Sequence, residues 1–455
     1  MRHRIFVNSL KLLLLALAAC VARTAAAASV IGTNVIAQPL TRERIATLPK
    51  KQQKAWREYL QRSDNQKAID KATLQAEMKA AKITADESKP APAHPNAYGL
   101  YLTPDRTDAW YASADAVRIA TNVVSYQLAD GGWSKNIDMT VGPRKPGDRY
   151  DTDNLNRYPD PGDFDRAVDE HWHYLATLDN DATSTQIIFL AHVATALLAA
   201  NRNHDAAPFT AAVRRGVEYL LASQYPNGGW PQVWPLEGGY HDAITINDDA
   251  DLHAIEVLRD AADPSGDYSY LPQPLRRRAA AAADRGMKCI LSLQIEENGA
   301  RSAWAQQYDA LTLAPTSARN YEMASLASGE SATIVDYLMS LPNPTPAEVA
   351  AVHAAAAWFT KTEIFGFRWG SGDFRTDRSN PDGRRLVAVS GAGPIWSRYC
   401  QIGTDKPIFG DRDKTIHDDV NEISRERRNG YSWYNAAGIN LLATYKTWAQ
   451  LHPQP

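Results

Sequence analysis

Two stretches of the sequence decide the fold: QLADGGWSKN at residues 127–136 and QYPNGGWPQV at residues 224–233. Each begins with a Gln at the end of an apolar helical pattern and runs through a Gly pair to a Trp. A third, degraded copy, QIEENGARSAWAQQ, occupies residues 294–307. A Gly pair permits the positive-φ turn that ends a helix, and a Trp can pack back over the exposed helix end. The chain therefore repeats one unit of helix, glycine turn and tryptophan.

Amphipathic helical windows recur around these loops, and no comparable set of alternating strands accompanies them. Their apolar residues recur at i, i+3 and i+4, and the windows cover residues 113–127, 184–202, 209–224, 248–262, 274–294, 328–341, 345–362 and 434–452. This pattern predicts an all-α fold, an (α/α) toroid of helix pairs whose long loops collect on one rim. The tryptophans of the repeat could plug helix ends or line a site on that rim, and the sequence leaves both interpretations open.

The overall composition describes an ordinary soluble globular protein. The chain has 455 residues, of which 44% are hydrophobic and 22% charged, with a net charge of -3. So small a net charge does not call for a nucleic acid, and it leaves room for an anionic ligand held by local basic groups. We expect a monomer with no nucleic-acid partner.

The amino-terminal residues have the pattern of an export signal. MRHR is a positively charged start, LKLLLLALAACVA is an apolar stretch too short to span a bilayer comfortably, and RTAAAAS offers cleavage sites near Ala28. We therefore expect a signal peptide at 1–28, a helical arm and linker at 29–98, and the toroid domain at 99–455. LAAC, ending at Cys20, also resembles a lipobox, so the product is either secreted or a periplasmic or outer-membrane lipoprotein. Apart from such a lipid, no membrane contact is expected.

The cysteine content does not identify a function. If Cys20 leaves with the signal or carries lipid, Cys289 and Cys400 remain. In an oxidising compartment they could form one disulfide or stay as buried thiols. No thiolate metal site can be built from two cysteines.

Two oxygen-rich loops precede helical windows and suggest a cation site. The first is TLDNDATSTQ and the second GGYHDAITINDDADLH, and if the toroid is right they share a rim. Capping needs only one side-chain oxygen per helix, whereas a hard cation such as Ca²⁺ prefers several carboxylate and amide oxygens. The candidate metal ligands are Asp179, Asn180, Asp181, Asp242 and Asp248.

Basic and aromatic side chains also fall in loops between the helical windows. They are Lys135, Arg319, Arg398, Lys406 and Arg412, together with Trp433 and Tyr434 after the charged run that ends at Arg428. Cation-holding loops, carboxylate-binding cations and rings that stack on sugars together describe a cleft for an acidic polysaccharide. The alternative for Trp433 and Tyr434 is that they pack the start of the last helix.

The sequence lacks the motifs of several other classes of enzyme. It contains no G-x-S-x-G elbow, no H-E-x-x-H and no phosphate-binding glycine loop. Two alternatives stay open: a glycoside hydrolase with a carboxylate pair drawn from Glu297, Glu322, Glu330 or nearby Asp residues, and a non-catalytic sugar-binding protein.

Several motifs together resemble the pectate lyases of polysaccharide lyase family 10. They lie in order between about Ala112 and Lys446, and the last is the most specific: DGGWSKNIDM, TLDNDATSTQIIFLA, QYPNGGWPQVWP with GYHDAITINDDA, APTSARNYEMASLASGES, and RYCQIGTDKPIFGDRDKTIHDDVNEISRERRNGYSWY. The first 98 residues lie outside the resemblance.

The resemblance implies a secreted (α/α) toroid that cleaves polygalacturonate by Ca²⁺-dependent β-elimination. It implies Arg319 as the catalytic base, Asp179 as a calcium ligand and Arg398 as a substrate-binding residue. A free guanidinium holds its proton at ordinary pH, so a base role predicts that Ca²⁺ and other cations depress the pKa of Arg319.

Overall fold

The structure is a computed structural model that describes residues 29–94, 106–153, 162–166, 169, 172–297, 299–370 and 383–454. The expected signal peptide, with Cys20, lies outside the described residues, as does part of the linker, and the proposed cleavage and lipidation stay predictions.

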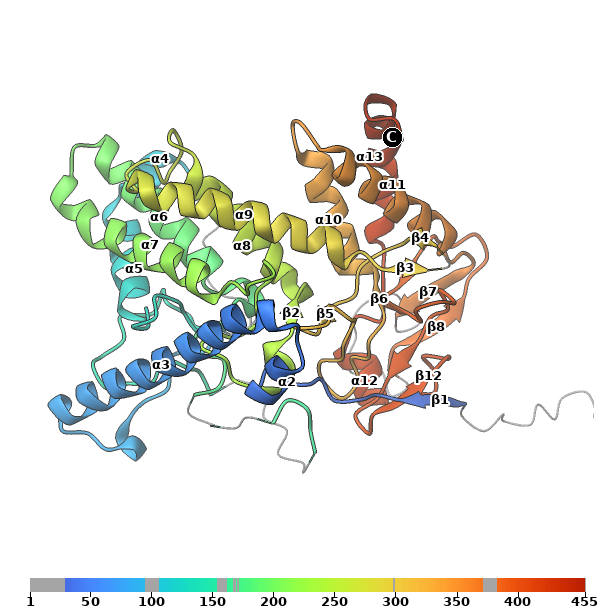
Figure 1. Cartoon of the computed structure of the whole chain (residues 1–455), viewed down its shortest axis with the longest axis horizontal. Coiled ribbons are helices and arrows are strands. Elements are labelled where there is room, and N and C mark those ends of the chain that lie inside the picture. The colour runs from blue at the N-terminus through green and yellow to red at the C-terminus, as the bar shows by residue number, and fades with distance from the viewer. Residues whose placement is uncertain are drawn as a thin grey trace, which may run out of the picture.

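Helix pairs of an (α/α) toroid form the body of the molecule, as the sequence predicted (Figure 1). Each apolar window forms a helix, and consecutive helices such as α6 and α7 pack against each other. The helices are α5 (Ala114–Ser125), α6 (Ser184–Ala199), α7 (Asn203–Ser223), α8 (Ala250–Ala262), α9 (Gln273–Leu293), α10 (Ser328–Ser340), α11 (Pro346–Lys361) and α13 (Ala437–Leu451). Caps set several boundaries. The Ser113 hydroxyl accepts the Ala116 amide before α5, and Thr345 begins α11 with a capping box.

The repeated tryptophans close helix ends in the same way in all three copies. Each indole is fully buried and donates its N–H at 2.8 Å to a carbonyl near the end of the preceding helix: Trp133 to Val123, Trp230 to Leu220 and Trp304 to Ile290. An orphan carbonyl at a helix end needs such a partner when it is buried. These three rings are therefore plugs of the fold and do not line a cleft.

The glycine turns of the first two copies are almost superimposable in their contacts. Gly131 and Gly228 have φ of 101° and 103°, and a Cβ on either would lie 2.4 Å from a backbone carbonyl oxygen of the next outer helix, at Arg215 or Arg285. Only glycine combines this φ with so close an approach. The turns thus fix each rim loop against the helix pair that follows.

The amino-terminal arm packs into the main core of the toroid. It comprises β1 (Val30–Thr33), α2 (Arg42–Ala46), α3 (Lys50–Ala81) and a 3₁₀ turn, η1 (Ala85–Glu87). Trp56 and Tyr59 of α3 are buried in the same hydrophobic core as the toroid helices. Figure 1 shows α3 crossing the molecule beneath them.

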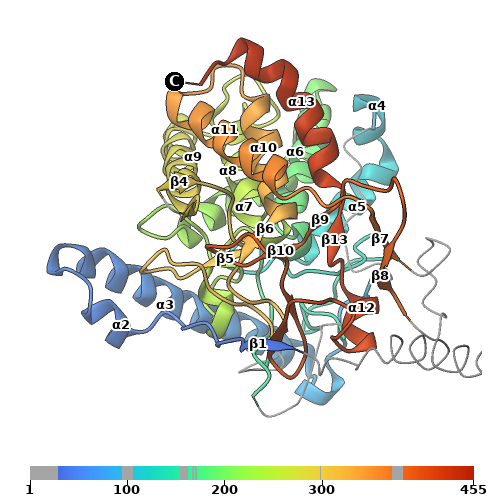
Figure 2. The ribbon, with the colours of Figure 1, turned by 90° about the vertical axis from the view of Figure 1, so that its right-hand side faces the viewer.

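Strand β1 pairs antiparallel with β12 (Thr415–His417), which also pairs with β11 (Phe409–Gly410) (Figure 1). Figure 2 shows β1 at the end of the molecule opposite α13. Beyond this small sheet, the side-chain amide of Asn34 donates to the carbonyls of Arg319, Asn320 and Glu322 at 3.1, 3.0 and 3.3 Å. The arm therefore reaches the loop that carries the predicted base.

Short strand pairs and two short helices stiffen the other loops. They are β2 (Ile244–Thr245) with β5 (Gln307–Tyr308), β3 (Glu296–Glu297) with β4 (Ala300–Arg301), β6 (Leu326–Ala327) with β10 (Tyr399–Cys400), β7 (Phe367–Gly370) with β8 (Arg385–Ala388), β9 (Trp396–Ser397) with β13 (Tyr434–Asn435), and helices α4 (Asp108–Tyr111) and α12 (Arg425–Gly430). Strands of two to four residues are too short to show an alternating pattern. Cys289 in α9 and Cys400 in β10 are both buried and free.

Candidate active site

Two acidic 3₁₀ turns of the same shape lie in contact on the rim. They are η2 (Asp179–Asp181), which precedes α6, and η4 (Asn247–Asp249), which precedes α8. Asn180 and Asp181 have φ of 52° and 60°, and Asp248 and Asp249 have φ of 52° and 55°. Asn and Asp tolerate this left-handed backbone better than other side chains because they can hydrogen-bond locally. The repeat therefore brings two oxygen-rich turns together, as the sequence predicted.

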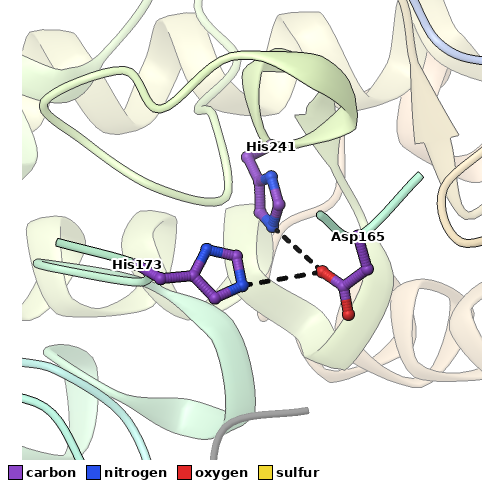
Figure 3. A group of neighbouring side chains, drawn as sticks. All are labelled: Asp165, His173 and His241. Carbon is purple, nitrogen blue, oxygen red and sulfur yellow. Dashed lines mark ion pairs between the residues drawn. The ribbon is translucent and has the colours of Figure 1, made fainter. Parts of the chain in front are cut away.

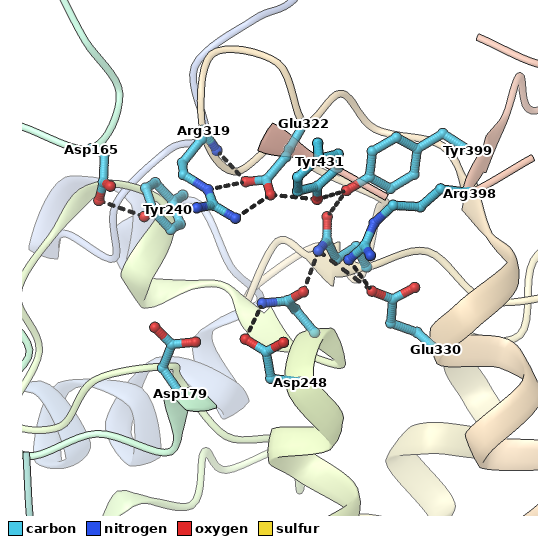
Figure 4. Close-up of polar contacts among 12 residues, drawn as sticks. Asp165, Asp179, Tyr240, Asp248, Arg319, Glu322, Glu330, Arg398, Tyr399 and Tyr431 are labelled. Carbon is cyan, nitrogen blue, oxygen red and sulfur yellow. Dashed lines mark hydrogen bonds and ion pairs between the residues drawn. The ribbon is translucent and has the colours of Figure 1, made fainter. Parts of the chain in front are cut away.

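One carboxylate from each turn lines a shared cavity of about 80 Å³. These are Asp179 and Asp248, which Figure 4 shows on neighbouring turns beneath Arg319. Burial raises the pKa of Asp179, but the Lys135 ammonium and a hydrogen bond with Asp248 outweigh it and lower this pKa to about 2. Burial and the charge of Asp179 raise the pKa of Asp248 well above its usual value. A second negative charge is therefore unfavourable in this cavity, and a bound cation would bring the compensating charge.

Lys135 closes one side of the cavity. Its ammonium pairs with the Asp179 carboxylate and lies 3.4 Å from the centre of the Tyr174 ring. Lys135 is only 9% exposed, so the ion pair and the ring replace most of its hydration. A buried ammonium at this point is suited to holding a carboxylate ligand.

Of the three remaining predicted metal ligands, one lines the cavity and two do not. Asn180 lines the cavity and donates its amide to the side chain of Asn136 at 2.9 Å. Asp181 points elsewhere, with its carboxylate 3.3 Å from His253. Asp242 does not line the cavity, contrary to the expectation, because its carboxylate accepts the backbone amides of Leu40 and Gly238. Asp242 thus fastens the amino-terminal arm.

Arg319 lies across the cavity from the two carboxylates and forms a bidentate pair with Glu322. Its Nε is 2.8 Å from Oε2 and its Nη2 is 2.6 Å from Oε1. Burial lowers the pKa of Arg319, but the Glu322 carboxylate and nearby tyrosines outweigh it and raise this pKa above its usual value. The ion pair with Glu322, which the sequence did not reveal, thus opposes the depression of this pKa that a base role expects from Ca²⁺ and other cations, and that depression stays a prediction.

Arg398 occupies the adjoining region and is held by Glu330. Its Nη2 is 2.8 Å from Glu330 Oε1, and its guanidinium lies 4.7 Å from the centre of the Tyr431 ring. Tyr431 in turn donates its hydroxyl to Glu322 at 2.7 Å. Arg398 and Arg319 are therefore linked through Tyr431 and Glu322, as Figure 4 shows.

The other predicted substrate-binding residues do not line this cavity. Lys406 is exposed, and Arg412 pairs with Glu426 at 3.1 Å. Trp433 is fully buried in a second hydrophobic cluster with Tyr434 and donates its indole N–H to the carbonyl of Arg427. The geometry assigns both rings to packing, which was the alternative interpretation.

The three glutamates considered for hydrolysis are held by other groups. Glu322 and Glu330 are each bound by an arginine, and the ion pair with Arg319 outweighs burial and lowers the pKa of Glu322. Glu297 accepts the Gly403 amide outside the cavity. Among the nearby Asp residues, Asp248 has the raised pKa that a general acid for hydrolysis needs, so the hydrolase alternative is decided by the product of the reaction.

Several lining residues were not singled out from the sequence: Asp165, Tyr174 and Tyr240. Asp165 and Tyr174 come from segments without a repeat or a quoted motif, whereas Tyr240 lies in the second oxygen-rich loop, where only the acidic and amide residues were considered. Only the recurrence of aromatic and acidic residues beside the glycine loops could have suggested them.

A family model and two solved structures that match this chain are of polysaccharide lyases. The sequence model of the pectic acid lyase family matches residues 127–442. No protein in the curated set matches the chain. Among solved structures, a point mutant of a family 10 polysaccharide lyase from Cellvibrio cellulosa in complex with trigalacturonic acid has 30% sequence identity and a TM-score of 0.60. A second structure of a family 10 polysaccharide lyase from that organism has 30% identity and a TM-score of 0.59. Each match covers 76% of this chain and 96% of the other.

Proposed function

The chain belongs to the pectic acid lyase family and is a polysaccharide lyase, and from this premise we propose that it cleaves pectate by calcium-dependent β-elimination with Arg319 as the base. The observation that carries the proposal is that Asp179, Asp248 and Arg319, from three separate loops, line one buried polar cavity.

The residues of this cavity fit calcium. Asp179 and Asp248 offer two carboxylates, and Asn180 and Asn247 offer amide oxygens beside them. Ca²⁺ prefers such hard oxygen donors on flexible loops. When bound, calcium stabilises the negative charge that develops on a substrate carboxylate, which makes the neighbouring C–H bond more acidic.

The chemistry of the substrate assigns roles to the other residues. Elimination takes the proton from C5 of a galacturonate, forms a double bond between C4 and C5, and breaks the C4–O bond so that the glycosidic oxygen leaves and is protonated. Arg319 would accept the C5 proton, while Lys135 and Arg398 would bind carboxylates of the chain. The complex of the similar lyase with trigalacturonic acid supports a polygalacturonate substrate for this chain. We expect internal cleavage of the polymer.

Arg319 can act as a base only after losing its proton, which the ion pair with Glu322 opposes. The proposal therefore requires alkaline conditions or added positive charge near Arg319, such as a bound calcium ion and Lys135. It predicts a rate that increases with pH.

We further propose that the protein acts outside the cytoplasm after export. The support is the charged start, apolar stretch and Ala-rich cleavage region of residues 1–28. Mass spectrometry of the exported protein would distinguish cleavage near Ala28 from a lipid-modified Cys20.

The test is the ultraviolet absorbance of polygalacturonate incubated with the purified protein at alkaline pH, first with Ca²⁺ and then with excess chelator. Unsaturated product that forms with Ca²⁺ and stops with chelator supports the proposal. Reducing ends without ultraviolet absorbance would indicate hydrolysis and overturn it. Arg319→Ala should abolish product formation while leaving the thermal transition in place.

A further inference from the structure

A buried cluster of two histidines and one aspartate lies at the edge of the cavity (Figure 3). Asp165, His173 and His241 are 4%, 1% and 3% exposed. Asp165 Oδ1 is 3.8 Å from His173 Nε2 and 3.6 Å from His241 Nε2, and the three atoms all lie within 4.8 Å of one another.

Hydrogen bonds on the far side of both rings set their orientation. His173 Nδ1 contacts the carboxylate of Glu237, and His241 Nδ1 is 3.3 Å from the carbonyl oxygen of Gly238. Both acceptors require a proton on Nδ1, which leaves Nε2 with a lone pair in the neutral ring. Neither Nε2 has a hydrogen-bond partner in the described part of the chain, although both are buried.

Two lone pairs and a carboxylate that face one another in a buried site favour a positive charge between them. We propose that Asp165, His173 and His241 bind one divalent transition-metal ion, with Zn²⁺ as the best match. Two imidazole nitrogens and one carboxylate oxygen suit zinc, whereas calcium prefers oxygen ligands alone. This site is therefore different in chemistry from the acidic turns, and it does not depend on the proposed function.

The geometry lies close to that of a zinc site. Ligands held at 2.0–2.1 Å in a tetrahedron are about 3.3 Å apart, so each histidine Nε2 would move toward Asp165 Oδ1 by a few tenths of an ångström. The two Nε2 atoms, which lie within 4.8 Å of each other, would close to the same spacing. Glu237 and the Gly238 carbonyl are partners of the kind that metal-bound histidines almost always have behind them. Tyr240 and Tyr174 donate to Asp165 Oδ1 at 2.6 and 3.1 Å and hold the carboxylate in place.

The ion would fix one wall of the cavity. Tyr174 and Tyr240 line it, their hydroxyls meet at 2.8 Å, and the ring of Tyr174 carries the Lys135 ammonium.

The experiment is a zinc titration of the mature protein without a histidine tag, after chelation and dialysis, in saturating Ca²⁺ so that the acidic turns are occupied. Isothermal calorimetry should give one equivalent of Zn²⁺, and His173→Gln and His241→Asn should each weaken binding at least about 100-fold. His192→Gln is the matched control, because His192 lies on helix α6, is not part of the cluster and pairs with Asp267. It should bind Zn²⁺ like the wild type.

Equal zinc binding by the wild type and both variants, or no binding by the folded wild type, would overturn the proposal. If the variants fail to fold, X-ray absorption of the zinc-loaded wild type decides instead. A shell with two imidazole nitrogens supports the site, and a shell of oxygens alone, or with one imidazole, overturns it.

Discussion

The guanidinium of Arg319 and the carboxylate of Glu322 form a two-point ion pair at 2.8 and 2.6 Å, three residues apart in one loop. This pair fixes the direction in which Arg319 faces. It also stabilises the protonated guanidinium, which a base must give up. Replacing Glu322 tests whether its effect on the protonation of Arg319 controls the reaction rate.

Glu322→Gln should shift the alkaline limb of the pH–rate profile to lower pH. Removing the carboxylate removes the charge that raises the pKa of Arg319, so the neutral base forms at lower pH. The measurement is kcat/KM on polygalacturonate across the alkaline range, with Glu426→Gln, whose carboxylate pairs with Arg412 at the surface, as the control. A limb that stays in place would show that Arg319 acts only as a fixed cation.

Asp179→Ala and Asp248→Asn should each weaken Ca²⁺ binding by at least about 100-fold, because each removes one carboxylate from the shared cavity. Asp242→Asn is the matched control, since this neighbouring carboxylate binds backbone amides. The measurement is the Ca²⁺ concentration for half-maximal lyase activity, supported by calorimetry. Loss of Ca²⁺ affinity in Asp242→Asn alone would restore it as a ligand.

Trp433→Ala should lower the free energy of unfolding by about 3–5 kcal/mol, because the ring is fully buried among aromatic neighbours. Urea denaturation measures this loss, and Trp433→Phe should recover much of it. A folded Trp433→Ala protein should keep its KM. An increased KM with an unchanged unfolding midpoint would instead assign the ring to substrate binding.

Asn34→Ala should lower kcat more than it changes KM. The side-chain amide of Asn34 holds three carbonyls of the loop around Arg319, and a buried carbonyl without a partner costs about 1–3 kcal/mol. Val35→Ala, at an exposed neighbouring side chain, is the control. Asn34→Asp tests the chemistry, because a carboxylate cannot donate to carbonyls and should not restore the rate. Equal kcat in wild type and Asn34→Ala would exclude a positioning role.

Asp70→Asn should stabilise the protein by about 1–3 kcal/mol above pH 6 and have little effect near pH 4. Burial raises the pKa of Asp70 to about 6, and burial together with the charge of Asp70 raises that of Asp130 well above its usual value. A carboxyl with a raised pKa in the folded state costs stability as pH increases from its unfolded value, near 4, to its folded value. Thermal midpoints measured from pH 4 to 9 would test this, and a uniform shift at every pH would contradict it.

Much of the fold could be predicted because its signals are local. The helical windows and the Gln-to-Trp loops each act within about ten residues, and the Gly pairs of these loops predict the positive-φ turns found at Gly131 and Gly228. The close approach of these glycines to the carbonyls of Arg215 and Arg285 could not be predicted in this way. The acidic turns were also accessible, because Asp179 and Asp248 precede helices in two copies of one repeat.

Partnerships between distant segments were not accessible in the same way. In the sequence Asp242 and Asp248 lie in the same acidic loop and look equivalent. The carboxylate of Asp242, however, accepts a hydrogen bond from the backbone amide of Leu40, 202 residues away. Trp433 looked like a sugar platform until its burial was known. The histidine cluster joins Asp165 to His173 and His241, and no motif links these positions.

The pairing of β1 with β12 affects when the enzyme can complete its fold during synthesis. Val30 faces His417 across the small sheet, so the segment made first must wait for one of the last. A chain that emerges amino end first leaves Asn34 without its partners until residues 319–322 are made, and leaves β1 without its own until residues 415–417 follow. The loop around Arg319 therefore reaches its final contacts late in synthesis, after most of the polypeptide has been made.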